Sequence, residues 1–151
     1  MLRAARIVRR AAVRMQRVAD RITLDHQSRH RRRVKLTGDG GTEFLLDLPQ
    51  AAVLDDGDAV ELEDGRLVQV KAAPERLIEV RTTDPLRLMQ IAWHLGNRHV
   101  AAEITLDAVY IADDHVLMDM LRGLGAKVAV VERPFRPERG AYHGHDGHGH
   151  D

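Results

Sequence analysis

Histidine is the residue type in this sequence best suited to chemistry. The chain has nine histidines, and four of them fall in its last nine positions: His143, His145, His148 and His150. Glycines separate these four, so the backbone can wrap round an ion, and Asp146 and Asp151 can add oxygen ligands. Neutral imidazole binds nickel, copper, zinc and cobalt, and short His-rich tracts are typical of metal-binding segments. The tail therefore predicts metal binding without selecting one metal.

Two histidines lie at the end of a predicted helix. His99 comes three residues after Gly96, the glycine expected to end that helix, and on spacing alone a capping or solvent-exposed role competes with a ligand role. His94 falls on the helix itself, in a narrow polar stripe with Arg87 and Gln90. It is either an accessory ligand or a structural residue.

The remaining histidines differ in their surroundings. His115 opens a second predicted helix, on the side away from the apolar face, where the helix dipole favours the neutral ring that a metal needs. A capping Asp113-Asp114 pair acts against that effect. His26 and His30 lie among arginines, which repel a cation, and we expect both to be surface residues.

The charge of the chain is divided unevenly along its length. The 151 residues carry 23 basic and 23 acidic side chains, but residues 1–36 hold twelve of the basic ones and only two acids. The remaining 115 positions therefore hold eleven basic residues and twenty-one acids. Between residues 39 and 64 there are nine acids and no basic residue, which predicts a docking surface for the basic cluster of Arg29, Arg31, Arg32, Arg33 and Lys35.

Several classes of function are disfavoured. There is no cysteine, which excludes disulfides, thiolate zinc sites and thiol catalysis. We find no HExxH motif and no glycine-rich phosphate loop, so a metal-dependent hydrolase is a poor alternative. No apolar run approaches the roughly 20 residues of a membrane helix, and we expect a cytoplasmic protein.

The first part of the chain is predicted to be a basic extension, over residues 1–19. Arginine recurs there every three or four positions, which allows an amphipathic helix. The alternatives for this segment are a frayed extension neutralised by the acidic body, a transit peptide, a membrane-surface arm and an RNA-binding arm. The absence of aromatic residues for base stacking argues against nucleic acid.

Residues 20–74 predict a small antiparallel β-rich domain. Apolar residues alternate with polar ones, and the breaks fall at turn-forming stretches such as 38–41 and 56–58. A hinge is expected near residues 71–74.

Residues 75–142 predict a ferredoxin-like βαββαβ domain, which makes the whole chain α+β. The first helix is expected to begin after Asp84, with Pro85 in its first turn, and to end at Leu95. It is apolar nearly all round, so we expect a second copy of the chain to cover one side of it. The His-rich tail, residues 143–151, is expected to be disordered without a ligand.

These residues together resemble the urease accessory protein UreE family. The resemblance rests on HLGNRH at 94–99, DHVL at 114–117, Pro134-Phe135 and the His-rich tail, and on DDGD at 55–58 and EDGR at 63–66. It covers about residues 20 to 151, and the Arg-rich first twenty residues lie outside the pattern.

The resemblance implies a homodimeric nickel metallochaperone and not an enzyme. Its cargo would be Ni(II), with Zn(II), Cu(II) or Co(II) able to bind in vitro, and its partners the urease accessory GTPase and the urease apoprotein assembly complex. His99 would be the central ligand, one from each subunit, with His94 and His115 as secondary positions and the tail recruiting further ions. Some relatives carry another histidine where this chain has Asp113, so a second peripheral site would lack that ligand or use a carboxylate. The alternative function is nickel storage, mainly by the tail.

Overall fold

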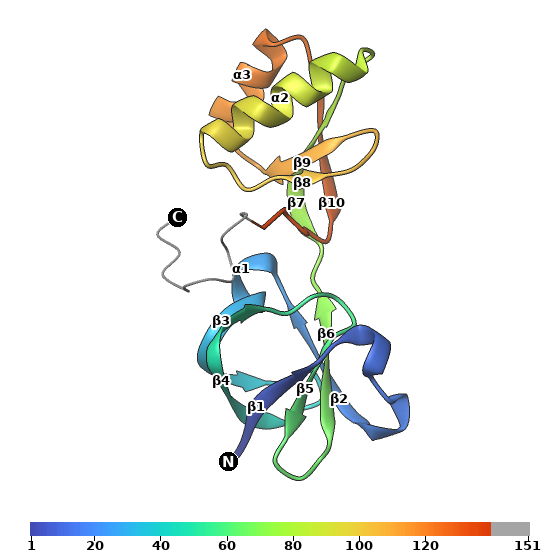
Figure 1. The fold of residues 1–151 in the computed structure, drawn as a ribbon, viewed down its shortest axis with the longest axis vertical. Coiled ribbons are helices and arrows are strands. Elements are labelled where there is room, and N and C mark those ends of the chain that lie inside the picture. The colour runs from blue at the N-terminus through green and yellow to red at the C-terminus, as the bar shows by residue number, and fades with distance from the viewer. Residues whose placement is uncertain (140–151) are drawn as a thin grey trace. The chain divides into compact units, whose positions relative to one another are not determined.

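The chain folds into two compact units, each with its own hydrophobic core. A computed structural model describes residues 1–139, and its two units divide between Ala73 and Pro74 (Figure 1). The protein is therefore a two-domain α+β chain, rich in strands and with few helices. The sequence-predicted tail lies outside the described residues. No helix in the described range is long and apolar enough to cross a membrane.

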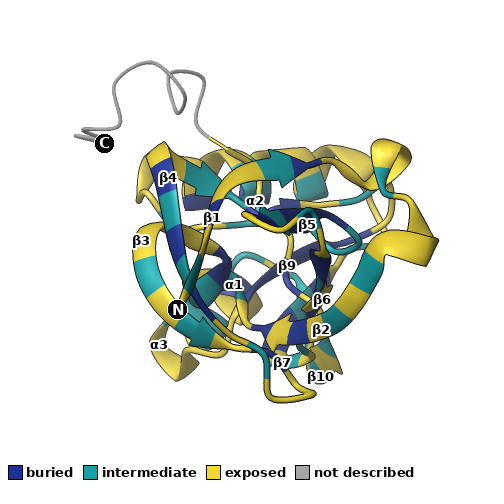
Figure 2. Cartoon of the chain, turned by 90° about the horizontal axis from the view of Figure 1, so that it is seen from below, coloured by how far each residue is buried: buried dark blue, intermediate teal, exposed yellow. Residues whose placement is uncertain are grey.

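The N-terminal unit is built on one mixed sheet of six strands in the order β2-β6-β5-β1-β4-β3. Strand β2, for example, alternates exposed residues with buried or half-buried ones (Figure 2). The pairs β1–β4 and β2–β6 are parallel, so the expectation of an antiparallel module is wrong for these two pairings. The elements are β1 (Leu2–Val8), the short 3-10 helices η1 (Arg10–Ala12) and η2 (Met15–Arg17), β2 (Val18–Leu24), α1 (His26–Arg29), β3 (His30–Thr37), β4 (Glu43–Val53), β5 (Ala59–Leu62) and β6 (Leu67–Ala72).

Strand β1 corrects the expectation of a basic helix or frayed extension at the N-terminus. It lies inside the sheet, between β4 and β5. A register shift in its pairing with β5 falls between Ala4 and Arg6, and the two consecutive residues Ala5 and Arg6 are both exposed. The core of the unit is contacted by Leu2 and Ala4 before the shift and by Ile7 after it. The bulge changes the alternation of the strand, which is why its residues repeat at a spacing that suggests a helix.

The arginines of the N-terminal segment pair with the acidic stretch at residues 39–64. Arg3 lies 2.7 Å from Asp47, and Arg6 and Arg17 lie 2.8 and 3.0 Å from Glu61. Arg33 of the second basic cluster also reaches Asp47, at 3.4 Å. The acidic stretch, expected to dock the cluster at 29–35, thus meets arginines from β1 and the turn after it as well.

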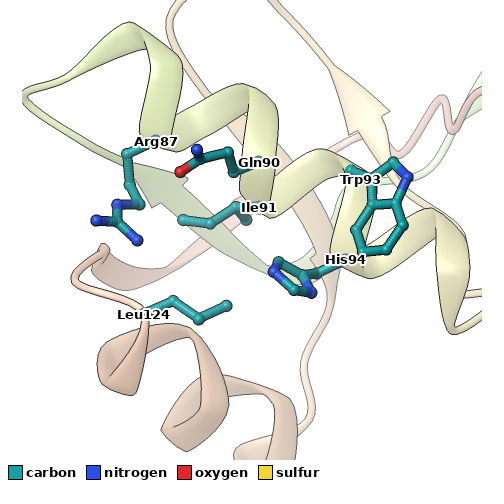
Figure 3. A pocket seen from close by; sticks show the side chains of 6 residues that line it. All are labelled: Arg87, Gln90, Ile91, Trp93, His94 and Leu124. Atoms are coloured by element: carbon teal, nitrogen blue, oxygen red, sulfur yellow. The ribbon is translucent and has the colours of Figure 1, made fainter.

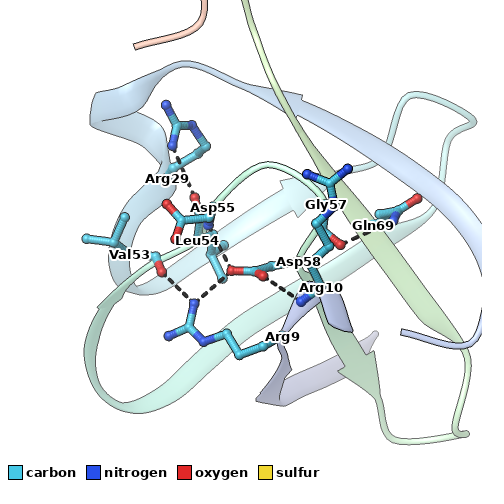
Figure 4. A network of polar contacts seen from close by, with 9 residues as sticks. All are labelled: Arg9, Arg10, Arg29, Val53, Leu54, Asp55, Gly57, Asp58 and Gln69. Carbon is cyan, nitrogen blue, oxygen red and sulfur yellow. Dashed lines mark hydrogen bonds and ion pairs between the residues drawn. The ribbon is translucent and has the colours of Figure 1, made fainter. Parts of the chain in front are cut away.

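A buried carboxylate ties the end of β1 to the turn before β5 (Figure 4). The Asp58 side chain is only 4% exposed. It accepts hydrogen bonds from the Arg9 guanidinium (2.7 Å), the Arg10 amide (2.8 Å) and the Asp55 amide (2.9 Å). Because a buried carboxylate is costly unless its oxygens are satisfied, these three donors hold the N-terminal segment in place.

The C-terminal unit carries two helices on one face of a four-stranded antiparallel sheet (Figure 1). Its elements are β7 (Glu75–Arg81), α2 (Pro85–Asn97), β8 (Glu103–Ile104), β9 (Val109–Ala112), α3 (His115–Gly123) and β10 (Lys127–Arg133), with the sheet order β10-β7-β9-β8. This succession of elements is the one expected from the sequence. The core between sheet and helices includes Ile78, Val80, Ile91, Leu95, Val109, Ile111 and Leu121.

The starts of both helices are set by side-chain capping. Asp84 accepts a hydrogen bond from the Leu86 amide at 3.0 Å, and Pro85 follows it. Asp114 accepts from the amides of Val116 and Leu117. Capping of this kind satisfies amide groups that have no partner inside the helix, so both helices begin where the sequence predicts.

We predict that Asp58→Asn destabilises the N-terminal unit by about 2 kcal/mol, because an amide cannot accept all three hydrogen bonds. The measurement is urea unfolding followed by far-UV circular dichroism, while the fluorescence of Trp93 reports the C-terminal unit separately. Glu43→Gln, at an exposed position of the same sheet, is the control and should leave both transitions unchanged. Equal stability of the two variants would contradict the prediction.

Candidate metal-binding site

His99 lies at the first residue beyond the C-terminal cap of α2 and has a left-handed backbone, with φ at 59°. Its amide donates to the Gly96 carbonyl (3.0 Å), and the Val100 amide donates to the Leu95 carbonyl (3.0 Å). This pair of bonds is the Schellman motif, in which glycine is the usual left-handed residue. His99 is the one residue other than glycine with positive φ within residues 1–139.

The turn fixes where the His99 side chain is presented. Leu95 and Val100, on either side of the turn, both pack in the core of the unit, whereas His99 itself is exposed. A left-handed backbone costs a residue with a Cβ about 1–2 kcal/mol. Such strain at an exposed side chain is a reason to suspect function.

The end of α2 differs from the sequence-based expectation. The helix continues through Gly96 to Asn97, and His99, not Gly96, takes the left-handed position. A sequence signal for this helix end is the pair of apolar residues Leu95 and Val100, five positions apart. The Schellman motif brings such a pair together, and here both pack in the core.

His94 is exposed on the flank of α2 and lines a hollow of 360 Å³ (Figure 3). Its ring meets that of Trp93 edge to face, with centroids 5.2 Å apart. The predicted polar stripe with Arg87 and Gln90 is present, because both residues line the same hollow. The other lining residues are Ile91, Trp93 and Leu124.

His115 is the first residue of α3 and is exposed. The neighbouring Asp114 carboxylate is used in capping, as predicted. Asp113 forms an ion pair with Arg76 at 2.7 Å. An Asp113 carboxylate that joined a peripheral metal site would therefore have to leave or share this pair.

The described residues of one chain do not gather a closed metal site. Within residues 1–139 there is no group of three or more histidine and carboxylate side chains placed to hold an ion. His99, His94 and His115 all belong to the C-terminal unit, whereas His26 in α1 and His30 in β3 belong to the N-terminal unit. The tail positions His143, His145, His148 and His150 lie outside the described residues.

The outer face of α2 is apolar and uncovered in the single chain. Leu86, Met89 and Trp93 are 55%, 64% and 64% exposed. Their spacing places them along one side of the helix, next to the polar stripe. This is the second apolar face that the sequence predicts for the helix.

Residues 134–139, which we call the strap, fall in the predicted C-terminal domain, but the sequence analysis did not predict how they pack. Phe135 is only 3% exposed and packs with Leu77, Ala108 and Tyr110. The Glu138 amide donates to the Ala102 carbonyl at 2.8 Å. The strap therefore ends beside the short segment that links His99 to β8.

The buried Glu103 carboxylate holds the strap to the sheet. One oxygen accepts from the Arg136 amide (2.9 Å) and the other from the Arg133 guanidinium (2.9 Å). Arg133 also lies over the ring of Tyr110, 3.9 Å from its centroid. Burial raises the pKa of the Tyr110 phenol, which stays protonated and donates to Glu79.

Comparison with known proteins identifies the family. The profile of the UreE urease accessory protein N-terminal domain matches residues 6–73, and that of the C-terminal domain matches residues 75–151. The chain belongs to the UreE urease accessory protein family.

Individual relatives of this UreE-family chain agree with the profiles. A urease accessory protein UreE from Azorhizobium caulinodans is 66% identical over 150 residues, which cover 99% of this chain and 72% of the relative. The UreE of a Chelativorans species is 54% identical, over 89% of this chain and 86% of its own. The UreE of Agrobacterium fabrum is 48% identical over a stretch that covers 86% of this chain and 81% of the relative.

The family match also corrects the reading of the N-terminus. The profile begins at residue 6, so most of the Arg-rich segment belongs to the family's N-terminal domain and not outside it. This agrees with the position of β1 inside the sheet.

We predict that His99→Gly keeps or increases the stability of the C-terminal unit, whereas His99→Val lowers it. Glycine adopts positive φ freely and a β-branched residue does not, so the two variants should differ by about 1–2 kcal/mol. Urea unfolding followed by Trp93 fluorescence measures this difference. Equal stabilities would mean that the turn does not hold a left-handed residue at position 99.

We predict that Glu103→Gln loosens the strap, because the amide replaces an oxygen that accepts a charge-assisted hydrogen bond. Hydrogen exchange of the Arg136 amide should become about tenfold faster or more. Glu132→Gln, an exposed change on β10, is the matched control and should leave this rate unchanged. Similar rates in both variants would show that Glu103 does not hold the strap.

Proposed function

We propose that this UreE-family protein is a nickel metallochaperone that takes part in urease maturation. It captures Ni(II) and delivers it to the urease assembly machinery, through the urease accessory GTPase and the urease apoprotein complex, and it catalyses no reaction. The family match supports the accessory role. The nickel role rests on the placement of the histidines.

The observation that carries the proposal is the backbone of His99. The chain places a histidine, exposed, at a left-handed position that glycine would occupy without strain. Because the turn anchors both flanks of His99 in the core, its imidazole is held on a rigid support rather than on a loose loop. A ligand presented in this way loses little conformational entropy when it binds an ion.

We propose that the central site is formed by two copies of the chain, with His99 from each copy as ligand. One described chain gathers no three-ligand group within residues 1–139, so further ligands must come from elsewhere. The exposed apolar face of Leu86, Met89 and Trp93 on the same helix supports a homodimer formed through the C-terminal unit. The order β10-β7-β9-β8 supports a ferredoxin-like assignment of that unit.

The other histidines are proposed as secondary positions. His94 and His115 are both exposed in the same unit and are available as peripheral ligands. His143, His145, His148 and His150 are proposed to recruit additional ions. Ligation by imidazole without thiolate leaves the ion exchangeable, which suits delivery, and does not by itself exclude Zn(II), Cu(II) or Co(II).

Equilibrium dialysis with Ni(II) tests the central site. A chain cut after Tyr142 should keep about one ion per two copies, as a ligand pair on a two-fold axis requires. His99→Gly in the cut chain should lose that ion while the unit stays folded. His26→Ala, in the N-terminal unit, is the control and should keep it.

The same experiment separates delivery from storage. If the cut chain binds no nickel, storage by the tail becomes the better function and the central site is wrong. If it binds, urease activation in cells tests delivery: a chain with His99→Gly should activate urease poorly when nickel is scarce. Full activation by that variant under scarce nickel would contradict delivery through His99.

A further inference from the structure

Strand β3 carries basic side chains that the folded N-terminal unit does not neutralise. Four of them, which we call the basic edge, lie close together along the strand, and all are exposed: Arg31, Arg32, Arg33 and Lys35. Arg33 reaches Asp47 at 3.4 Å. Among the described residues, none forms an ion pair with the other three. The basic edge therefore presents positive charge to the surroundings of the unit.

The acidic stretch at residues 39–64 leaves this charge uncompensated because other arginines occupy its carboxylates. Asp47 is shared between Arg33 and Arg3, and the Arg3 guanidinium lies nearer, at 2.7 Å. Glu61 likewise holds one arginine from β1 and one from η2. Asp58 is buried beside a further arginine of the same segment. Each shared carboxylate carries one negative charge against two guanidinium groups, so basic charge remains in excess.

The position of β3 in the sheet gives these cations a direction. β3 is the last strand in the order β2-β6-β5-β1-β4-β3, so within residues 1–139 it has a strand neighbour, β4, on one side only (Figure 1). Val34 and Leu36 pack against the core. Because successive residues of a strand point to opposite faces, the alternating residues Arg31, Arg33 and Lys35 project away from the core. An edge of this kind offers backbone amide and carbonyl groups to a further strand.

The simplest role of charge on an edge strand is to keep copies of the chain apart. Two β3 strands placed edge to edge would bring like charges together, and such repulsion is one way in which proteins prevent the pairing of their edges. This repulsion acts against a second copy but not against an acidic strand, which the same cations attract. The basic edge therefore excludes one class of strand and selects another.

Other polyanions fit this surface less well. Residues 1–73 contain a single aromatic residue, Phe44, and it is fully buried, so no ring is available there to stack on nucleic-acid bases. A membrane-binding surface would combine its cations with exposed apolar side chains, whereas Val34 and Leu36 of β3 pack against the core. A strand that bears carboxylates uses both features of this edge, its charge and its backbone groups.

The geometry of a strand sets the sequence that such a partner needs. β3 has eight residues, which is long enough for a strand of ordinary length, about five or six residues, to pair along it. Acidic residues at every second position of the added strand would all lie on one face. They would repeat at the same spacing as Arg31, Arg33 and Lys35.

We propose that β3 is a docking edge for an acidic segment of a partner protein. This segment adds to the sheet as an extra strand and faces the basic edge with carboxylates at every second residue. Main-chain hydrogen bonds hold the segment in register, and the ion pairs select its sequence. The proposal does not rest on the proposed nickel function, because it uses no histidine.

Fluorescence anisotropy of labelled peptides tests the docking edge on the full, metal-free chain. The first probe is a short peptide in which glutamate alternates with threonine. The second has the same composition with its glutamates in one block, and the third is the alternating peptide with every backbone amide methylated. We expect saturable binding of the first peptide and none of the third, because methylated amides cannot donate to β3. The block peptide should bind about fivefold more weakly or worse, since it misplaces at least one ion pair.

Substitutions in the basic edge test which side chains select the peptide. Arg31→Gln combined with Lys35→Gln should weaken binding of the alternating peptide about tenfold, because two exposed ion pairs are lost. Arg14→Gln combined with Lys71→Gln is the matched control, since it also removes one arginine and one lysine from exposed positions of the N-terminal unit, outside β3. The control should bind the peptide as the parent chain does. Both double variants should keep the urea transition of the N-terminal unit.

Four outcomes would overturn the proposal. Absence of saturable binding of the alternating peptide would mean that the basic edge only keeps copies apart. Equal binding of the block peptide would mean that charge acts without strand pairing. A control variant weakened as much as the β3 variant would indicate a nonspecific charge effect. Tighter binding of a labelled uridylate oligonucleotide than of the alternating peptide would make nucleic acid the better partner.

Discussion

The turn that ends α2 is the constraint on which the candidate site depends. Two backbone hydrogen bonds and the burial of Leu95 and Val100 close this turn, and they leave position 99 in a left-handed conformation facing solvent. The turn is set by the helix and the core, not by the histidine, so the chain can present an imidazole there although residues 1–139 gather no group of three metal-binding side chains around it. The candidate site can therefore have a defined position even though the described residues of one chain form no closed ligand group.

Two buried carboxylates hold the segments near the two ends of the described chain. Asp58 accepts from an arginine and from the amide of Arg10, and so holds the segment after β1. Glu103 accepts from an arginine and from the amide of Arg136, and so holds the strap. In each case a guanidinium and a backbone amide satisfy the charge together, which makes burial of the carboxylate tolerable. Some of the 23 basic and 23 acidic residues thus pair with each other inside the folded units, as Arg9 does with Asp58 and Arg133 with Glu103.

Much of the C-terminal unit could be predicted from sequence because local signals agree with the fold there. Asp84, Pro85 and Asp114 mark helix starts by mechanisms that act within one turn. Strand β1 could not be predicted in the same way, because its bulge breaks the alternation that identifies a strand, and its partners lie forty or more residues away. The packing of the strap was not predicted for a related reason: the burial of Phe135 depends on contacts with Leu77, Ala108 and Tyr110, which no local sequence pattern reveals. The prediction of His99 as ligand rests on family resemblance, and its left-handed backbone depends on Leu95 and Val100 meeting in the core.

The central place of β1 has a consequence for how the protein is made. Strand β1 precedes both of its partners in the chain: it pairs in parallel with β4 and antiparallel with β5, and Ala4 faces Leu62 in the finished sheet. During translation this strand must therefore wait until nearly the whole N-terminal unit has been made, with the apolar residues Leu2, Ile7 and Val8 unprotected. Arg3 and Arg6 lie between these apolar residues and give the segment positive charge, and charged residues beside an apolar strand lower the tendency of an unfolded segment to associate. The same side chains pair with Asp47 and Glu61 in the finished sheet, so the acidic partners that neutralise their charge are made only after β1.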